Sequence, residues 1–575
     1  MPLKLKNKFL LVYKMNYIFN FDPLLQNLFH EKNVIEIEVD EIELHENLNI
    51  FTTESKNRLS ILQSLKEPIT KQGVIYLQKR LSQSRTLDEI KREQKEIMFL
   101  LKNPKILNTI YTTLKKIKDH ENDILWCIAE KSCSDSDHLS CGYFQHEFLR
   151  FLNRYNPVLF LLNVFTLLIA PIYATFSPVI IAIMPYFYFK LFTKIPVSFL
   201  TYMKIAKNIV FKVPNISAIK KMSLFSILTK LLSWLIYGQS VYSNAKTSER
   251  TKKILNEIQL KLESVQKTLR YNRTLISSLN ETPIEHTLKD YSHIFDRKTR
   301  PFEKVTNSYF HDWSLLLSEY NKITQFTSVK DKIKTDIKQM YTSWGRIDYL
   351  VSLCRTLING NWCIPFIRKK ETPYLSITDM YHPSIQNSCI TNSITLNNEH
   401  MLITGPNASG KSTLLKSVAI SVFLAHRLGI SPGKHMETSY FRHIYTHLNI
   451  QDAVGKESLF QREANKIKKQ IQMMNTLPGL HFSIIDELFH STNPGEAVKG
   501  AKWILSQIND NNNTMCLVST HFHELTDECE ELNKFKRFCI PFIRNDKGEI
   551  NYTYTLKEGV SEQNIALEML QKTED

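Results

Sequence analysis

The stretch that decides the fold is Met401-Leu-Ile-Thr-Gly-Pro-Asn-Ala-Ser-Gly-Lys-Ser-Thr413. Its first residues are mostly apolar and predict a buried strand, while the apolar pattern from Leu414 onward predicts a helix directly after it. Between the two, Gly405-x4-Gly410-Lys411-Ser412 has the spacing of a phosphate-binding loop, in which backbone N–H groups surround phosphate oxygens at a helix N-terminus. The stretch therefore predicts an α/β P-loop NTPase domain.

The residues expected to bind the nucleotide all lie in this loop. They are Gly405, Pro406, Asn407, Ala408, Ser409, Gly410, Lys411, Ser412 and Thr413. The Lys411 ammonium is expected to contact the β- and γ-phosphates, and the Ser412 hydroxyl is expected to ligate Mg²⁺. ATP and Mg²⁺ are therefore the predicted ligands.

Two later apolar runs end in side chains suited to phosphate chemistry. Phe482-Ser-Ile-Ile-Asp-Glu487 predicts a buried strand ending in two carboxylates, and Cys516-Leu-Val-Ser-Thr-His521 predicts another ending in a histidine. We expect Asp486 to hold Mg²⁺ through water, and Glu487 to orient or deprotonate the attacking water. His521 would sense the γ-phosphate. Glu487 and His521 are thus the predicted catalytic residues of an ATPase that releases ADP and phosphate.

The order and the residues of these segments resemble those of the MutS family of DNA mismatch-repair ATPases, which are of the ABC type. Residues 404–413 are similar to the family's phosphate loop, including Pro406-Asn407, and residues 486–496 to its Walker B and D-loop segment. Residues 519–526 resemble its switch-histidine segment. Asp452-x5-Ser-Leu-Phe-x2-Glu463 resembles its composite signature. The resemblance extends to residues 347–365, 381–383 and 556–566, and less specifically to the start of a MutS core at residues 70–73 and 90–94.

In that family the composite signature reaches the nucleotide of the opposite subunit. The resemblance therefore implies an ATP-driven dimer, either a homodimer or a MutS-like heterodimer, in which Ser458 and Thr492 complete the partner's site. It also implies binding of duplex DNA and a role in DNA mismatch repair or maintenance. As departures, we expect this chain to lack the N-terminal domain with the mismatch-reading wedge, and Cys389 stands where many members have an adenine-stacking phenylalanine.

A long apolar and basic segment lies in the middle of the chain. Residues 155–189 carry no charge or histidine, Pro171 and Pro178 lie near their middle, and residues 148–248 hold +11 of the net charge of +16 without one acidic residue. A membrane span needs about 20 apolar residues, so 155–189 predicts a hairpin of two short transmembrane helices. A buried pair of core helices is the alternative. Residues 231–245 predict an interfacial or buried helix more readily than a third span.

The predicted fold is multidomain, with a helical core and lever region, an inserted apolar membrane segment and a C-terminal α/β domain. We expect an N-terminal segment at 1–45, a MutS-core-like helical region at 46–154, the membrane segment at 155–245, returning lever helices at 246–365 and the MutS-like ATPase domain at 366–575. The protein would be anchored in a membrane with its ATPase domain in the cytosol.

Two rival functions remain open at this point. One is a MutS-type ATPase that acts on membrane or protein partners without DNA, which the acid-free segment favours. The other is a transporter ATPase, which is disfavoured because no Leu-Ser-Gly-Gly-Gln-like signature lies between Lys411 and Asp486.

The nine cysteines are scattered without a Cys-x-x-Cys pair, so we expect reduced thiols. Cys133, His138 and Cys141 make a poor zinc site because a second ligand pair is lacking.

Overall fold

The computed structural model of the 575-residue chain describes a large part of the sequence. The described residues are 39–51, 59–128, 146–165, 313–385, 389–406, 408–448, 459–489, 493–522, 524–527, 532–544 and 550–560, with scattered parts of 169–210 and 235–285. The chain divides into two compact units. Unit 1 comprises residues 1–118, 274–288 and 341–575, and unit 2 comprises residues 119–273 and 289–340.

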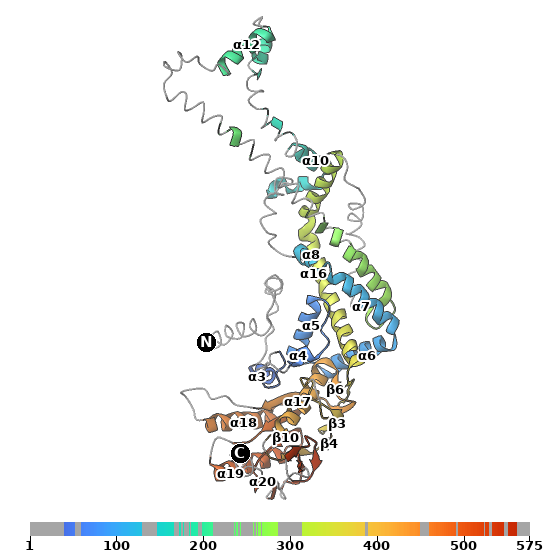
Figure 1. The fold of residues 1–575 in the computed structure, drawn as a ribbon, viewed down its shortest axis with the longest axis vertical. Coiled ribbons are helices and arrows are strands. Elements are labelled where there is room, and N and C mark those ends of the chain that lie inside the picture. The colour runs from blue at the N-terminus through green and yellow to red at the C-terminus, as the bar shows by residue number, and fades with distance from the viewer. Residues whose placement is uncertain are drawn as a thin grey trace. The chain divides into compact units, whose positions relative to one another are not determined.

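A six-stranded sheet, of which β10 is labelled in Figure 1, forms the core of the α/β part of unit 1. Its strands lie in the order β14 (Lys557–Glu558), β11 (Phe535–Cys539), β5 (His400–Thr404), β10 (Thr514–Ser519), β9 (Leu480–Asp486) and β8 (Phe441–His447). Neighbouring strands pair in parallel, except that β14 is antiparallel to β11. The strands β5, β9 and β10 are almost completely buried, as is usual for parallel strands covered by helices.

Three helices pack on this sheet. Helix α17 (Lys411–Leu428) follows β5 through the phosphate loop and packs on β8, β9 and β10. Helices α18 (Leu459–Thr476) and α19 (Pro494–Asn509) share one apolar core with the strands. That core joins Ile467 of α18 and Ile504 of α19 to Leu402, Ile485 and Val518 of the sheet. The helices thereby hold β5, β9 and β10 in a fixed order around the loop.

Smaller sheets complete the α/β part of unit 1. A four-stranded sheet has the order β2 (Phe366–Arg368), β7 (His435–Ser439), β3 (Tyr374–Met380) and β4 (Asn392–Asn397). Two-stranded pairs are formed by β1 (Trp362–Cys363) with β6 (Ser431–Pro432) and by β12 (Phe542–Arg544) with β13 (Ile550–Tyr552). A short helix, α20 (Glu524–Asp527), follows β10. The connection from β3 to β4 reaches the cavity described below.

Polar caps begin three of the described helices in the remainder of unit 1, α4 (Ile61–Ser64), α5 (Lys71–Ser82) and α6 (Leu87–Lys102). This remainder also contains α7 (Pro104–Lys118) and residues 341–359 of α16 (Trp313–Asn359). The Thr70 side chain accepts the Gly73 N–H at the start of α5, and Thr86 forms a capping box with Glu89 at the start of α6. Asp348 of α16 accepts the Thr70 N–H at 2.6 Å and its hydroxyl at 2.7 Å, which ties α5 to α16.

Two side chains from the α6 region bind carbonyl groups at the C-terminal end of α17. Arg85 donates to the Arg427 carbonyl oxygen at 2.9 Å and forms a buried ion pair with Glu93 at 2.8 Å. Gln94 donates to the Gly429 carbonyl oxygen at 3.2 Å. The last carbonyls of a helix have no partner within it, so these bonds satisfy groups that burial would otherwise leave unpaired.

The N-terminal helix α3 (Val39–Asn47) packs on β8, which is an edge strand of the large sheet. The Asn47 amide donates to the Thr446 hydroxyl oxygen at 3.0 Å, and Glu43 pairs with Lys466 of α18. Leu44 is buried. An edge strand exposes unpaired backbone groups, so α3 covers a part of the sheet that would otherwise be open to other chains.

Unit 2 contains the region in which the sequence predicts a membrane segment. Its elements include α8 (Glu121–Ile128), the 3₁₀ helix η2 (Glu147–Arg154), α10 (Asn156–Val164), the π-helix η4 (Phe189–Thr193), α12 (Phe199–Val210) and residues 313–340 of α16. Helix α10 has 9 residues and α12 has 12, whereas a span needs about 20. No helix in the described part of the chain is long and apolar enough to cross a membrane.

The prediction of an inserted membrane segment is therefore wrong, and so is the predicted fold class that includes this segment. Much of the predicted hairpin at 155–189 and most of residues 231–245 lie outside the described residues. The same finding overturns the expected membrane-anchored location with a cytosolic ATPase domain. The physical reason is that an apolar composition satisfies one requirement of a span, while a continuous helix of sufficient length is a second, separate requirement.

Two buried histidines make the stability of unit 1 depend on pH. The His426 Nε2 accepts the Phe441 N–H at 2.9 Å, and the His400 Nδ1 accepts the Cys516 N–H at 3.2 Å, so both rings are neutral in the fold. Burial lowers the pKa of each to about 4 from the ordinary 6.5. Between pH 6.5 and about 4, these histidines bind protons in the unfolded chain but remain neutral in the folded chain. Their contribution to the stability of the folded chain is therefore fully present above pH 6.5 and falls as the pH decreases toward 4.

We predict that the free energy of unfolding drops by about 2 kcal/mol per histidine between about pH 7 and pH 5. The variant His426→Gln should be less stable than the natural chain at neutral pH. Between the two pH values, however, its free energy of unfolding should drop by about 2 kcal/mol less than that of the natural chain. Urea unfolding at the two pH values measures both quantities. His435→Gln, at an exposed position, serves as the control and should leave the drop unchanged. An equal drop in His426→Gln and the natural chain would contradict the prediction.

Candidate nucleotide-binding site

The phosphate loop joins the end of β5 to the start of α17. Gly405 has a φ of +153° and Gly410 a φ of +97°, in the left-handed region that favours glycine. A Cβ on Gly410 would lie 3.0 Å from the Tyr554 ring, so the loop also needs glycine there for space. Ala408 has a φ of +64°. The loop is therefore tightly wound around the helix N-terminus, where backbone N–H groups favour anions.

The Lys411 side chain lies across its own loop. Its Nζ donates to the carbonyl oxygens of Gly405 at 2.8 Å and Pro406 at 3.0 Å. Burial lowers the pKa of this ammonium below its ordinary value, while the nearby carboxylates of Glu487 and Asp486 act in the opposite direction. The lysine is thus held close to the carboxylate pair, in a loop shaped for phosphate.

The carboxylate pair lies at the end of β9, beside the end of β10. Asp486 and Ser519 are directly opposed in the parallel pairing of the two strands. The Ser519 hydroxyl donates to Asp486 Oδ1 at 2.5 Å and accepts the Glu487 N–H at 3.1 Å. Glu487 has a φ of +54°, so the chain turns sharply as it leaves the strand. This turn places Glu487 at the cavity beside the loop.

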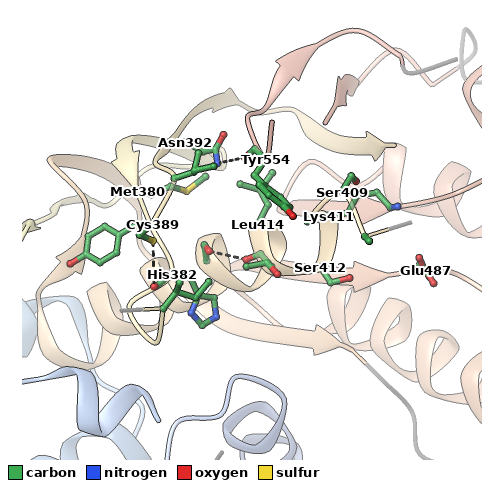
Figure 2. Close-up of a pocket in the computed structure, with 17 residues that line it drawn as sticks. Met380, His382, Cys389, Asn392, Ser409, Lys411, Ser412, Leu414, Glu487 and Tyr554 are labelled. Carbon is green, nitrogen blue, oxygen red and sulfur yellow. Dashed lines mark hydrogen bonds between the residues drawn. The ribbon is translucent and has the colours of Figure 1, made fainter. Parts of the chain in front are cut away.

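The loop opens into a cavity of about 660 Å³. In Figure 2 the labelled residues His382 and Cys389 lie toward one end of the cavity and Lys411 and Glu487 toward the other. This volume is within the range of small-molecule sites, roughly 300–1,000 Å³. The phosphate loop at one end of the cavity suits an anionic group of a bound ligand.

Tyr554 and Asn392 form one wall of this cavity (Figure 2). The Asn392 amide donates to the Tyr554 carbonyl oxygen at 3.0 Å, and its Oδ1 accepts the Leu556 N–H at 2.7 Å. These bonds hold the chain at 554–556 against the loop. The wall was missed by sequence reasoning, because Asn392 and Tyr554 are 162 residues apart and neither belongs to a motif.

The structure brings together some of the predicted site residues. Most loop residues and Glu487 line the cavity, and Asp486 lies next to Glu487. Asn407, Ser458 and Thr492 lie outside the described residues. His521 is exposed, contacts Phe522 with 4.1 Å between ring centroids, and is not among the described residues that line the cavity. Cys389 lines the cavity, and its thiol donates to the His382 carbonyl oxygen at 3.8 Å.

The oxygen donors at the site fit Mg²⁺. The Ser412 hydroxyl lies at the cavity, and the Asp486 carboxylate lies at the neighbouring strand end. Mg²⁺ prefers oxygen ligands and is commonly held by one or two protein groups together with substrate phosphates. Among the described residues no group of three or more His, Cys, Asp or Glu side chains could hold a metal alone.

The mostly parallel sheet and the glycine-rich loop between β5 and α17 are those of a P-loop α/β domain with a candidate nucleotide site. Residues 401–574 match the family model described as MutS domain V. The DNA mismatch repair protein MutS of Cytophaga hutchinsonii is 28% identical over 239 residues, which cover 40% of this chain and 27% of that protein. That of Clostridium kluyveri is 26% identical over 270 residues, which cover 44% of this chain and 30% of that protein. These findings support a relationship to the MutS family.

The similarity is confined to part of each chain. The matched segments span less than a third of the length of these two relatives. A third relative, the DNA mismatch repair protein MutS of Wolbachia pipientis wMel, is 26% identical over 226 residues, covering 26% of its length. The family-model match at residues 401–574 contains the phosphate loop and the carboxylate pair.

We predict that Lys411→Ala weakens binding of a fluorescent ATP analogue at least about tenfold, because a charged hydrogen-bond donor to phosphate is lost. Equilibrium fluorescence titration measures the affinity. Lys416→Ala on the same helix, outside the cavity lining, is the matched control and should bind as the natural chain does. Unchanged affinity in Lys411→Ala would show that the loop does not bind phosphate.

Proposed function

We propose that this chain binds and hydrolyses ATP with Mg²⁺ at the phosphate loop and acts in DNA mismatch repair or a related form of DNA maintenance. The observation that carries the ATPase proposal is the shared cavity, where Lys411, Ser412 and Glu487 come together at the N-terminus of α17. The match to MutS domain V supports the choice of family. The names of the similar proteins support the link to mismatch repair.

Each site residue has a distinct task in this proposal. The Lys411 ammonium moves from its own loop carbonyls to the phosphate oxygens, exchanging one set of acceptors for another. Ser412 and Asp486 would hold Mg²⁺, which would neutralise charge on the phosphates. Glu487 orients the attacking water and accepts its proton. His521 is proposed as the residue that senses the γ-phosphate, which requires it to approach the cavity from its exposed position.

Dimerisation driven by ATP is part of the proposal. Ser458 and Thr492 would complete the site of a partner subunit in a homodimer or a MutS-like heterodimer. Helix α18 begins at Leu459, directly after Ser458, and the Phe460 and Phe489 rings lie 5.1 Å apart. This contact joins the start of α18 to the segment after the carboxylate pair, so the two partner-facing segments would move together with the site.

Duplex DNA is the proposed partner because each similar protein cited above is named as a mismatch repair protein. ATP turnover with and without perfectly paired and mismatched duplex tests this. Stimulation by duplex DNA supports the proposal, and turnover indifferent to DNA contradicts the DNA part of it while leaving the ATPase part intact.

We predict that Glu487→Gln binds ATP with nearly natural affinity but hydrolyses it about a hundredfold more slowly, since a general base is removed and the shape is kept. The variant should also accumulate as an ATP-bound dimer. Phosphate release and light scattering of the eluting protein measure the two effects. The exposed Glu371→Gln is the control and should hydrolyse ATP normally. Hydrolysis by Glu487→Gln at the natural rate would rule out this residue as the base.

A further inference from the structure

Ser519 lies beside the proposed reaction centre, and although it begins the segment 519–526, it is not itself one of the predicted site residues. It is the last residue of β10, it is completely buried, and its Cα is paired with that of Asp486 across the parallel strands. Parallel strands end at the same edge of a sheet, so this pairing brings a serine hydroxyl next to a carboxylate that is proposed to hold Mg²⁺.

The Ser519 hydroxyl bridges the two carboxylate residues. It donates its one proton to Asp486 Oδ1 at 2.5 Å, and its oxygen accepts the Glu487 N–H at 3.1 Å. A hydroxyl has one donor and two acceptor positions, so donation to Asp486 uses the only proton that it has. One side chain therefore sets both the rotamer of Asp486 and the backbone position of Glu487.

The backbone at Glu487 explains why this second bond is needed. Its φ of +54° lies in the left-handed region, which residues other than glycine adopt at a cost of about 1 to 3 kcal/mol. Such a conformation persists only when surrounding contacts hold it. The bond from the Glu487 N–H to Ser519 is one such contact, and the turn that it holds places the Glu487 side chain at the cavity.

We propose that Ser519 is a positioning residue, which holds Asp486 in the orientation that binds Mg²⁺ and Glu487 in the turn that aims it at the attacking water. The inference rests on the proposed ATPase function. Ser519 touches neither nucleotide nor water itself and acts through the two carboxylates. Groups that orient metal-binding side chains in this way typically contribute about 10- to 100-fold to metal affinity or activity.

The test compares Ser519→Ala with Ser519→Thr. Alanine removes the hydroxyl and adds no bulk, whereas threonine keeps the hydroxyl and suits a strand. In Ser519→Ala, the Mg²⁺ concentration that gives half-maximal tightening of fluorescent ATP binding should rise about tenfold, while binding measured in EDTA should be unchanged. The maximal rate of hydrolysis should fall about tenfold, and Ser519→Thr should restore most of both losses.

Ser483→Ala is the matched control. Ser483 is also completely buried, it lies on β9, and its hydroxyl accepts a hydrogen bond from Gln470 rather than contacting the carboxylate pair. Its loss should destabilise the sheet without changing the Mg²⁺ dependence. Melting temperatures of the variants show how much stability each one loses.

The outcomes separate this inference from the proposed function. Suppose that the natural chain binds and hydrolyses ATP, but that Ser519→Ala needs the same Mg²⁺ concentration as Ser483→Ala for half-maximal tightening of ATP binding. The positioning role is then wrong and the ATPase proposal stands. If the natural chain binds no ATP, both proposals fall. A selective loss of Mg²⁺ response in Ser519→Ala, restored by Ser519→Thr, supports the inference.

Discussion

The parallel pairing of β5, β10 and β9 is the constraint on which the rest of the site depends. Strands that run in the same direction end at the same edge, so everything that follows them meets there. The phosphate loop leaves β5, the Asp486–Glu487 pair ends β9, and Ser519 ends β10. The helices that share an apolar core with these strands keep them in order. A shift of the register would separate the loop from the carboxylates, because side chains alternate between the faces of a strand.

The helix that carries the phosphate loop is held at both ends. At its N-terminus the loop closes on itself through the Lys411 ammonium. At its C-terminus it is bound by Arg85, whose ion-pair partner Glu93 also accepts the Tyr349 hydroxyl of α16 at 2.6 Å. Removing one member of such a buried group would leave an unpaired charge, which is strongly destabilising. A continuous set of polar contacts therefore links the α/β part of unit 1 to its helical part.

The middle of the chain shows the limit of reasoning from composition. Residues 155–189 are apolar and lie between basic flanks, which are features of a membrane hairpin. The helices described there are short, and no helix in the described ranges meets the length that a span requires. Composition reports which surroundings side chains prefer, whereas the length of a continuous helix depends on the whole backbone.

The sequence by itself determined the features that depend on residues close together in the chain. The strand, loop and helix at 401–428 follow from glycine spacing and apolar pattern, and the polar ends of β9 and β10 could be found in the same way. Only the tertiary structure decided that Ser519 bridges the carboxylates and that Asn392 holds the chain at Tyr554 against the loop. The hydrogen bond from Arg85 to the C-terminal end of α17 was likewise decided only by the tertiary structure. Such contacts join residues far apart in the chain, so strand order and register, which no local pattern encodes, bring them together.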